Sequence, residues 1–105
     1  MINIEFNDAK VSAKEAQLLS EGIQEIVSSV TGIKDVFVYT NTAQIKVQIA
    51  QVEIFVRMTS AKIKDLDELT DKIKSQLTTW KGNEGFKHPI NLTVIPMDWR
   101  VEISI

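Results

Sequence analysis

The chain lacks cysteine altogether, and its 105 residues include one histidine, two prolines and four glycines. The absence of cysteine excludes disulfides, thiolate zinc sites and cysteine nucleophiles. An excess of charge of one sign is missing too: the net charge is −2, with both signs interspersed, so no overall field attracts nucleic acid or anionic lipid. No window approaches the roughly 20 apolar residues that span a bilayer. We therefore expect neither nucleic acid nor a membrane as a partner.

The N-terminal residues alternate between apolar and polar types, and they lack the basic start and apolar run of a signal peptide. From this we expect a cytoplasmic location. The length fits one domain, here residues 1–105. The composition, 44% hydrophobic and 25% charged, is typical of a globular protein.

Local patterns in the first half predict a strand, a helix and a second strand. Residues 2–6 alternate as a strand with one buried face. Ser12 and Glu15 have the spacing of a capping box, which marks a helix start, and Gly32 is a typical helix end. Residues 36–39 are β-branched and aromatic, and residues 40–42 are predicted to form a turn.

Alternation returns in residues 45–49, slips at Ala50 and resumes over residues 52–58. Because a one-residue slip moves every side chain to the other face, we predict a bulge or a break near Ala50. A second helix is predicted from near Ser60 to the glycines of residues 82–85, followed by a strand over residues 90–97. The positions expected to be almost fully buried under the sheet are Leu19, Ile23, Ile26, Leu66, Ile73 and Leu77.

These elements predict an α+β fold built from two β-α-β units, with both helices on one face of a four-stranded mixed sheet. The first unit covers residues 1–42, and the second covers residues 43–105 with a C-terminal strand. The halves align as a diverged repeat at an offset of about 47 residues, although apolar helix faces align easily by chance.

The apolar residues of the C-terminal segment, residues 99–105, alternate with polar ones. An exposed apolar row of this kind is unfavourable in water. The segment is expected to pair either within its own sheet or with a neighbouring subunit.

The residues contain no self-sufficient catalytic, cofactor or metal motif. His88 lies in a loop before Pro89, and there is no second histidine to supply a ligand pair. We interpret it as a solvated loop histidine. The glycines of residues 82–85 are not followed by a lysine–serine pair or by a helix, so they do not form a phosphate loop. We expect neither a metal nor a cofactor.

The strings that carry a family resemblance are Ser12-x-x-Glu15, the apolar helix face through Val30-Thr31-Gly32-Ile33, Val36-Phe37-Val38, and Val52-Glu53-Ile54-Phe55-Val56-Arg57. They resemble the tautomerase superfamily, in particular the members that carry two fused β-α-β units. The resemblance implies a tautomerase-like homo-oligomer, a trimer, that acts on a small molecule which the residues do not specify.

One departure from that family concerns its chemistry. The family uses an N-terminal proline as general acid and base, whereas Ile2 occupies that place here. A residue as large as isoleucine leaves Met1 attached, so the terminus is expected to be a primary amine. The divergent chain is therefore expected to lack efficient proline-type tautomerase activity, with Met1 as the candidate catalytic group.

The arginines of the chain are Arg57 and Arg100. Arg57, near the end of a predicted central strand, is the candidate anchor for an anionic ligand; the alternative is an exposed or salt-bridged arginine. A competing interpretation of the whole chain is a ferredoxin-like, non-enzymatic binding or oligomerisation module. It has the same element order, and the turn at residues 40–42 would join its central hairpin.

Overall fold

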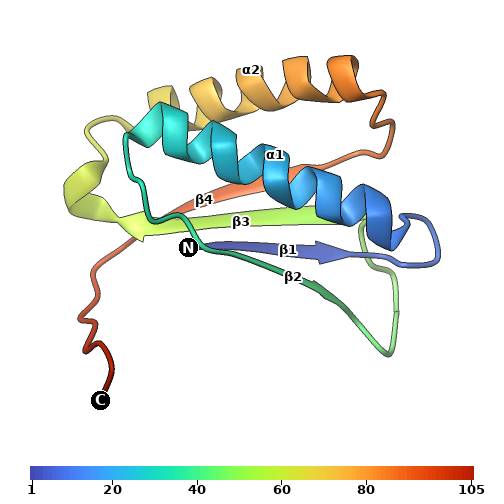
Figure 1. The fold of residues 1–105 in the computed structure, drawn as a ribbon, viewed down its shortest axis with the longest axis horizontal. Helices are drawn as coiled ribbons and strands as arrows, with labels where there is room; N and C mark the ends of the chain where they lie inside the picture. The colour runs from blue at the N-terminus through green and yellow to red at the C-terminus, as the bar shows by residue number, and fades with distance from the viewer.

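The computed structural model describes residues 1–105. The elements, in chain order, are β1 (Ile2–Phe6), α1 (Ala13–Thr31), β2 (Val38–Thr42), β3 (Val52–Thr59), a 3₁₀ turn (Ser60–Lys62), α2 (Leu66–Glu84) and β4 (Asn91–Met97). The strands form one sheet in the order β2-β1-β3-β4. The outer pairs β1–β2 and β3–β4 are parallel, and the central pair β1–β3 is antiparallel. Both helices cover the same face of the sheet (Figure 1), so the predicted fold class is confirmed. Neither helix is long and apolar enough to cross a membrane.

The hairpin required by the ferredoxin-like alternative is absent. β2 and β3 lie on opposite sides of β1, and residues 40–42 belong to β2 instead of a turn. The predicted strand over residues 45–49 is also wrong, because this connection is irregular and Ile45 is 83% exposed. Residues 45–49 pair with no strand, although the outer edges of β2 and β4 remain free. Of the two alternatives near Ala50, the structure shows a break.

The ends of the helices follow from local capping. The amide of Glu15 donates to Ser12 Oγ at 3.1 Å, and the amide of Ser12 donates to Glu15 Oε1 at 3.0 Å, which confirms the capping box. Gly32 ends α1 with a φ of 73°, where a residue without a β-carbon is favoured. The second helix begins at Leu66, later than predicted, because the Asp65 side chain accepts from the Glu68 amide and caps it.

The core lies between the helices and the covered face of the sheet. Strand residues such as Ile4 and Ile54 meet the helix residues Ile23 and Ile73, and all four are 0% exposed. Five of the six predicted core positions are confirmed. Leu66 is wrong: it is 38% exposed, because it is the first residue of α2 and lies outside the buried stripe.

The two β-α-β units are related by an offset of 50 residues. This offset pairs equivalent core positions, listed as Ile2 with Val52, Ile4 with Ile54, Leu19 with Leu69, Ile23 with Ile73, and Val27 with Leu77. It also relates two long-range backbone bonds, from the Asn7 amide to the Gln51 carbonyl at 2.9 Å and from the Arg57 amide to the Met1 carbonyl at 2.8 Å. The offset of 47 inferred from the helices is thus corrected. The apolar faces of two helices can be aligned at several sequence offsets, whereas the pairing of the strands selects the offset of 50 residues.

Candidate functional site

Met1 and Arg57, the two site residues singled out from the sequence, lie side by side. Because β1 and β3 are antiparallel neighbours, the start of β1 meets the far end of β3. The Met1 amine donates to the Arg57 carbonyl at 2.8 Å, and the Arg57 amide donates to the Met1 carbonyl at 2.8 Å. The structure therefore brings together two residues that are 56 positions apart in the chain.

The Arg57 side chain lies on the open face of the sheet, away from the helices. Val56 is buried under the helices, and successive strand residues point to opposite faces, so Phe55 and Arg57 share the open face. Arg57 Nη1 donates to Asn3 Oδ1 at 2.5 Å, and its Cζ lies 5.5 Å from the centre of the Phe55 ring. No ion pair of the chain includes Arg57. The guanidinium is positioned by an amide and a ring, and no carboxylate neutralises it.

The environment of the Met1 amine disfavours the charged form of this group. Partial burial lowers the pKa of this amine below its ordinary value of 8.0, and the neighbouring Arg57 charge lowers the pKa further. A lower pKa increases the neutral fraction, which is the form that can accept a proton. Two cationic groups without a counter-ion thus meet at this end of the sheet.

The surface around the Met1–Arg57 pair is open in the single chain. None of five surface hollows, with volumes between about 190 and 430 Å³, includes either residue. A small molecule that binds there would need further walls, and a neighbouring subunit can supply them.

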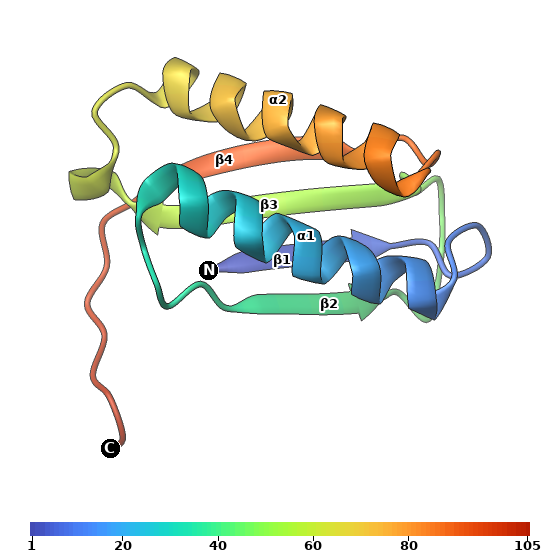
Figure 2. The same cartoon turned by 45° about the horizontal axis from the view of Figure 1, so that its top comes forward.

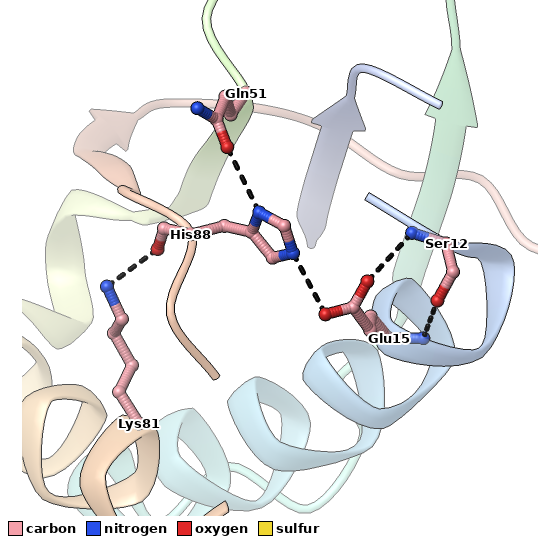
Figure 3. A network of polar contacts seen from close by, with 5 residues as sticks. All are labelled: Ser12, Glu15, Gln51, Lys81 and His88. Atoms are coloured by element: carbon pink, nitrogen blue, oxygen red, sulfur yellow. Dashed lines mark hydrogen bonds and ion pairs between the residues drawn. The ribbon is translucent and has the colours of Figure 1, made fainter. Parts of the chain in front are cut away.

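The opposite end of the sheet carries a polar network centred on His88 (Figure 3). His88 Nε2 lies 2.9 Å from Glu15 Oε2, and Nδ1 lies 3.0 Å from Gln51 Oε1. Lys81 Nζ donates to the His88 carbonyl at 2.6 Å, and the ring packs edge-on against Phe86 at 5.2 Å. The prediction of a solvated histidine is wrong. The ring bridges the start of α1 and the residue before β3, so its role here is to join segments.

The network also changes the acidity of Glu15. The backbone hydrogen bond from Ser12 lowers the pKa of the Glu15 carboxyl below its ordinary value of 4.5, and the contact with His88 lowers it further. No group of three or more histidine, cysteine or acidic residues is placed to hold a metal ion. The capping box that contains Glu15 was visible in the sequence, but its histidine partner, 73 residues away, was not.

The C-terminal segment does not form the predicted strand within the chain's own sheet. Residues 98–105 have no regular structure, and the segment is tied at its start by the Ser60 hydroxyl, which donates to Asp98 Oδ1 at 2.6 Å. Ile103 is 82% exposed, and Val101 and Ile105 are exposed as well. The apolar row found in the sequence therefore remains without a partner in the single chain.

Several solved structures are similar in fold to this chain over nearly its whole length. An FG41 malonate semialdehyde decarboxylase inhibited by 3-bromopropiolate is similar over 100% of this chain and 91% of its own, with a TM-score of 0.74 and 14% identity. A fused 4-OT in a symmetric trimer is similar over 99% of this chain and 93% of its own, with a TM-score of 0.65 and 13% identity. The chain has a tautomerase-like fold.

The same fold relates the chain to a macrophage migration inhibitory factor from Toxoplasma gondii, with a TM-score of 0.55 and 16% identity over 97% of this chain and 96% of that one. No protein-family model matches the sequence, and no curated protein matches it either. At these sequence identities the likeness shows the fold alone.

Proposed function

We propose that the chain is a divergent member of the tautomerase superfamily that forms a homo-oligomer and binds a small anionic molecule beside Met1 and Arg57. The observation that carries this proposal is the Met1 amine bonded to the Arg57 carbonyl, together with the Arg57 guanidinium, which lies on the open face of the sheet without an ion-pair partner. The proposal further holds that the protein lacks efficient proline-type tautomerase activity. The cytoplasmic location expected from the sequence stays a prediction.

Support for an oligomer comes from surfaces that the single chain leaves uncovered. Phe37 and Tyr39, near the outer strand β2, are 61% and 52% exposed, and the C-terminal apolar row is exposed too. Large apolar side chains that gather on one surface are typical of interaction sites. The fused 4-OT structure is a symmetric trimer, so we propose a trimer here.

The assembly is tested by deleting residues 99–105 and measuring the molar mass by light scattering. If the apolar row is buried against another chain, the deletion lowers the oligomeric state, because an alternating segment can add as a strand to a neighbour. A matched control replaces Arg100 and Glu102 by alanine, which removes charges and keeps the apolar row. A full-length protein that is monomeric at high concentration would contradict the proposal.

The anion site is favoured by charge and by geometry. Arg57 is held at Nη1 by Asn3 alone among the side-chain acceptors, which leaves further N–H groups of its planar fork for a carboxylate. The Met1 amine, bonded to the Arg57 carbonyl, provides a second donor at the same end of the sheet. A carboxylate or a similar small anion would supply the negative charge that the chain itself does not place there.

The chemistry is expected to be weak, because a primary amine replaces the secondary amine of proline. A free α-amine has a pKa near 7.7–8.0 and is mostly protonated at neutral pH. The lowered pKa of Met1 allows a slow reaction by the neutral amine. Ketonisation of a simple enol by the purified protein, with mass spectrometry to verify Met1, tests this expectation. Robust turnover that N-terminal acetylation abolishes would overturn it, and failure to turn over supports a binding role.

A further inference from the structure

The Met1 amine is held by one hydrogen bond, and its nitrogen can still react. The amine donates to the Arg57 carbonyl at 2.8 Å, and Met1 as a whole is 49% exposed. Figure 2 shows the N-terminus at the end of the sheet where β3 ends. A neutral primary amine has two N–H groups and one lone pair. One N–H is enough for the bond to Arg57, so the lone pair remains for a reagent that arrives from solvent.

The environment of Met1 favours the nucleophilic form of the amine. Partial burial lowers the pKa of this amine below 8.0, and the Arg57 charge lowers the pKa further. The neutral form is the nucleophile, and its share at neutral pH rises as the pKa falls. Met1 is therefore placed to react with a weak electrophile in neutral solution.

Two features around the amine narrow the choice of electrophile. The product should keep one N–H, because the Arg57 carbonyl accepts from this nitrogen. It should also carry a negative charge, because no ion pair of the chain includes Met1 or Arg57. A neutral imine, formed with an aldehyde or a ketone, has neither the N–H nor the charge. An amide keeps the N–H but is neutral, and its formation needs an activated acyl donor. A carbamate, formed with carbon dioxide, has both features and needs no other reactant.

We propose that the Met1 amine takes up carbon dioxide as a carbamate, which the Arg57 guanidinium stabilises. The nitrogen lone pair forms the new N–C bond, the electron pair of one C=O π bond moves to its oxygen, and one proton of the nitrogen passes to solvent. The amine and CO2 thus give R–NH–COO⁻ and H⁺. This inference rests on the proposed anion site and adds its regulation, because the carbamate supplies the negative charge and competes with an external anion for Arg57.

The Arg57 charge favours the carbamate at both stages of the reaction. This charge already acts on the Met1 nitrogen, since it lowers the pKa of the amine. The conversion of an ammonium group into a carbamate changes the charge at that position from +1 to −1. A neighbouring cation therefore destabilises the starting form and stabilises the product. The carbamate should appear as the pH rises through the lowered pKa of Met1, and so at a lower pH than for an ordinary α-amine.

The carbamate is measured by NMR on ¹⁵N-labelled protein with ¹³C-labelled bicarbonate, through the carbon bonded to the Met1 nitrogen, and mass spectrometry verifies Met1. N-terminal acetylation should abolish the signal. Arg57→Gln should lower the carbamate occupancy roughly two- to fivefold. That difference should persist near about pH 9, where the amine is mostly neutral in both proteins. Arg57→Lys should retain most of the occupancy, and Arg100→Gln should match the wild type.

Acetate titrations at fixed pH, with and without CO2, connect the carbamate to the anion site. CO2 should weaken acetate binding by the wild type and have no effect on the acetylated protein. A CO2 effect that persists after acetylation is competition by free bicarbonate and overturns the inference. If acetate binds but Met1 forms no carbamate, or if Arg57→Gln carries as much carbamate as the wild type, the inference is overturned and the proposed anion site stands. If neither acetate nor CO2 binds, both are contradicted.

Discussion

The two ends of the sheet are equivalent by the internal repeat, and the chain uses them differently. At one end the Arg57 amide bonds to the Met1 carbonyl, and at the other the Asn7 amide bonds to the Gln51 carbonyl in the same way. The Gln51 end is closed, because Gln51 and Glu15 both contact the His88 ring. The Met1 end is open and keeps two cationic groups without an anionic partner.

The comparison distinguishes polar groups that stabilise the fold from charged groups that are available to a ligand. The closed end satisfies its polar groups internally and links segments that are distant in the chain, which contributes to stability. The open end has the same backbone frame, but its two charged donors form hydrogen bonds to neutral acceptors and no ion pair. Of the two ends, the one whose charged groups have no anionic partner is the better candidate for an anionic ligand.

The largest expected effect on stability comes from truncating a core side chain between the helices and the sheet. Ile23 and Ile73 are equivalent positions, and both are 0% exposed. Replacement of either by alanine should lower the free energy of unfolding by about 2–5 kcal/mol, measured by chemical denaturation. A loss well under 1 kcal/mol at both positions would show that the helix faces are assigned incorrectly.

A smaller effect is expected where the two helices touch. A β-carbon at Gly22 would lie 2.6 Å from Trp80 Cε2, whereas one at Gly82 would meet nothing within 4 Å. Gly22→Ala should therefore destabilise the protein by about 1–3 kcal/mol through overpacking. Gly82→Ala, in the last turn of α2, should stabilise it by at most about 0.5–1 kcal/mol, the range that applies in the middle of a helix. Thermal unfolding of the pair measures both, and equal shifts of the same sign would contradict the packing described.

The closed end is tested by His88→Ala. This change removes the bond to Gln51 and the packing on Phe86, and it should cost about 1 kcal/mol of unfolding free energy. Lys87→Ala, at the exposed neighbouring position, serves as control and should change stability by less than about 0.5 kcal/mol. If both variants match the wild type, the network does not stabilise the closed end.

The smallest expected effect is a dependence on pH. The pKa of Glu15 is lower in the folded chain than its ordinary value of 4.5, so its contribution is complete above pH 4.5. The contribution is lost as the pH falls through the lowered folded pKa. The stability difference between wild type and Glu15→Gln should shrink over that acidic range in denaturant titrations. A difference that stays constant down to pH 3 would refute the assigned hydrogen bonds.

The parts of the fold predictable from sequence are those with a local physical cause. The capping box fixed the start of α1, and the alternation of β1 and of residues 52–58 predicted two strands. Alternation alone failed at residues 45–49, since a strand also requires cross-strand partners, and these residues pair with neither of the free edges of the sheet. The closeness of Met1 and Arg57 depends on the antiparallel pairing of β1 with β3, which no local pattern contains.

The binding of a small carboxylate at the open end tests the central claim most directly. Acetate is titrated into wild type, Arg57→Gln and the control Arg100→Gln while backbone amide signals are followed by NMR. The proposed site predicts saturable shifts around Met1 and Arg57 in wild type and in Arg100→Gln, few shifts around Gln51, and binding at least tenfold weaker in Arg57→Gln. Equal binding by Arg57→Gln and wild type would contradict the claim that this end of the sheet is the ligand site.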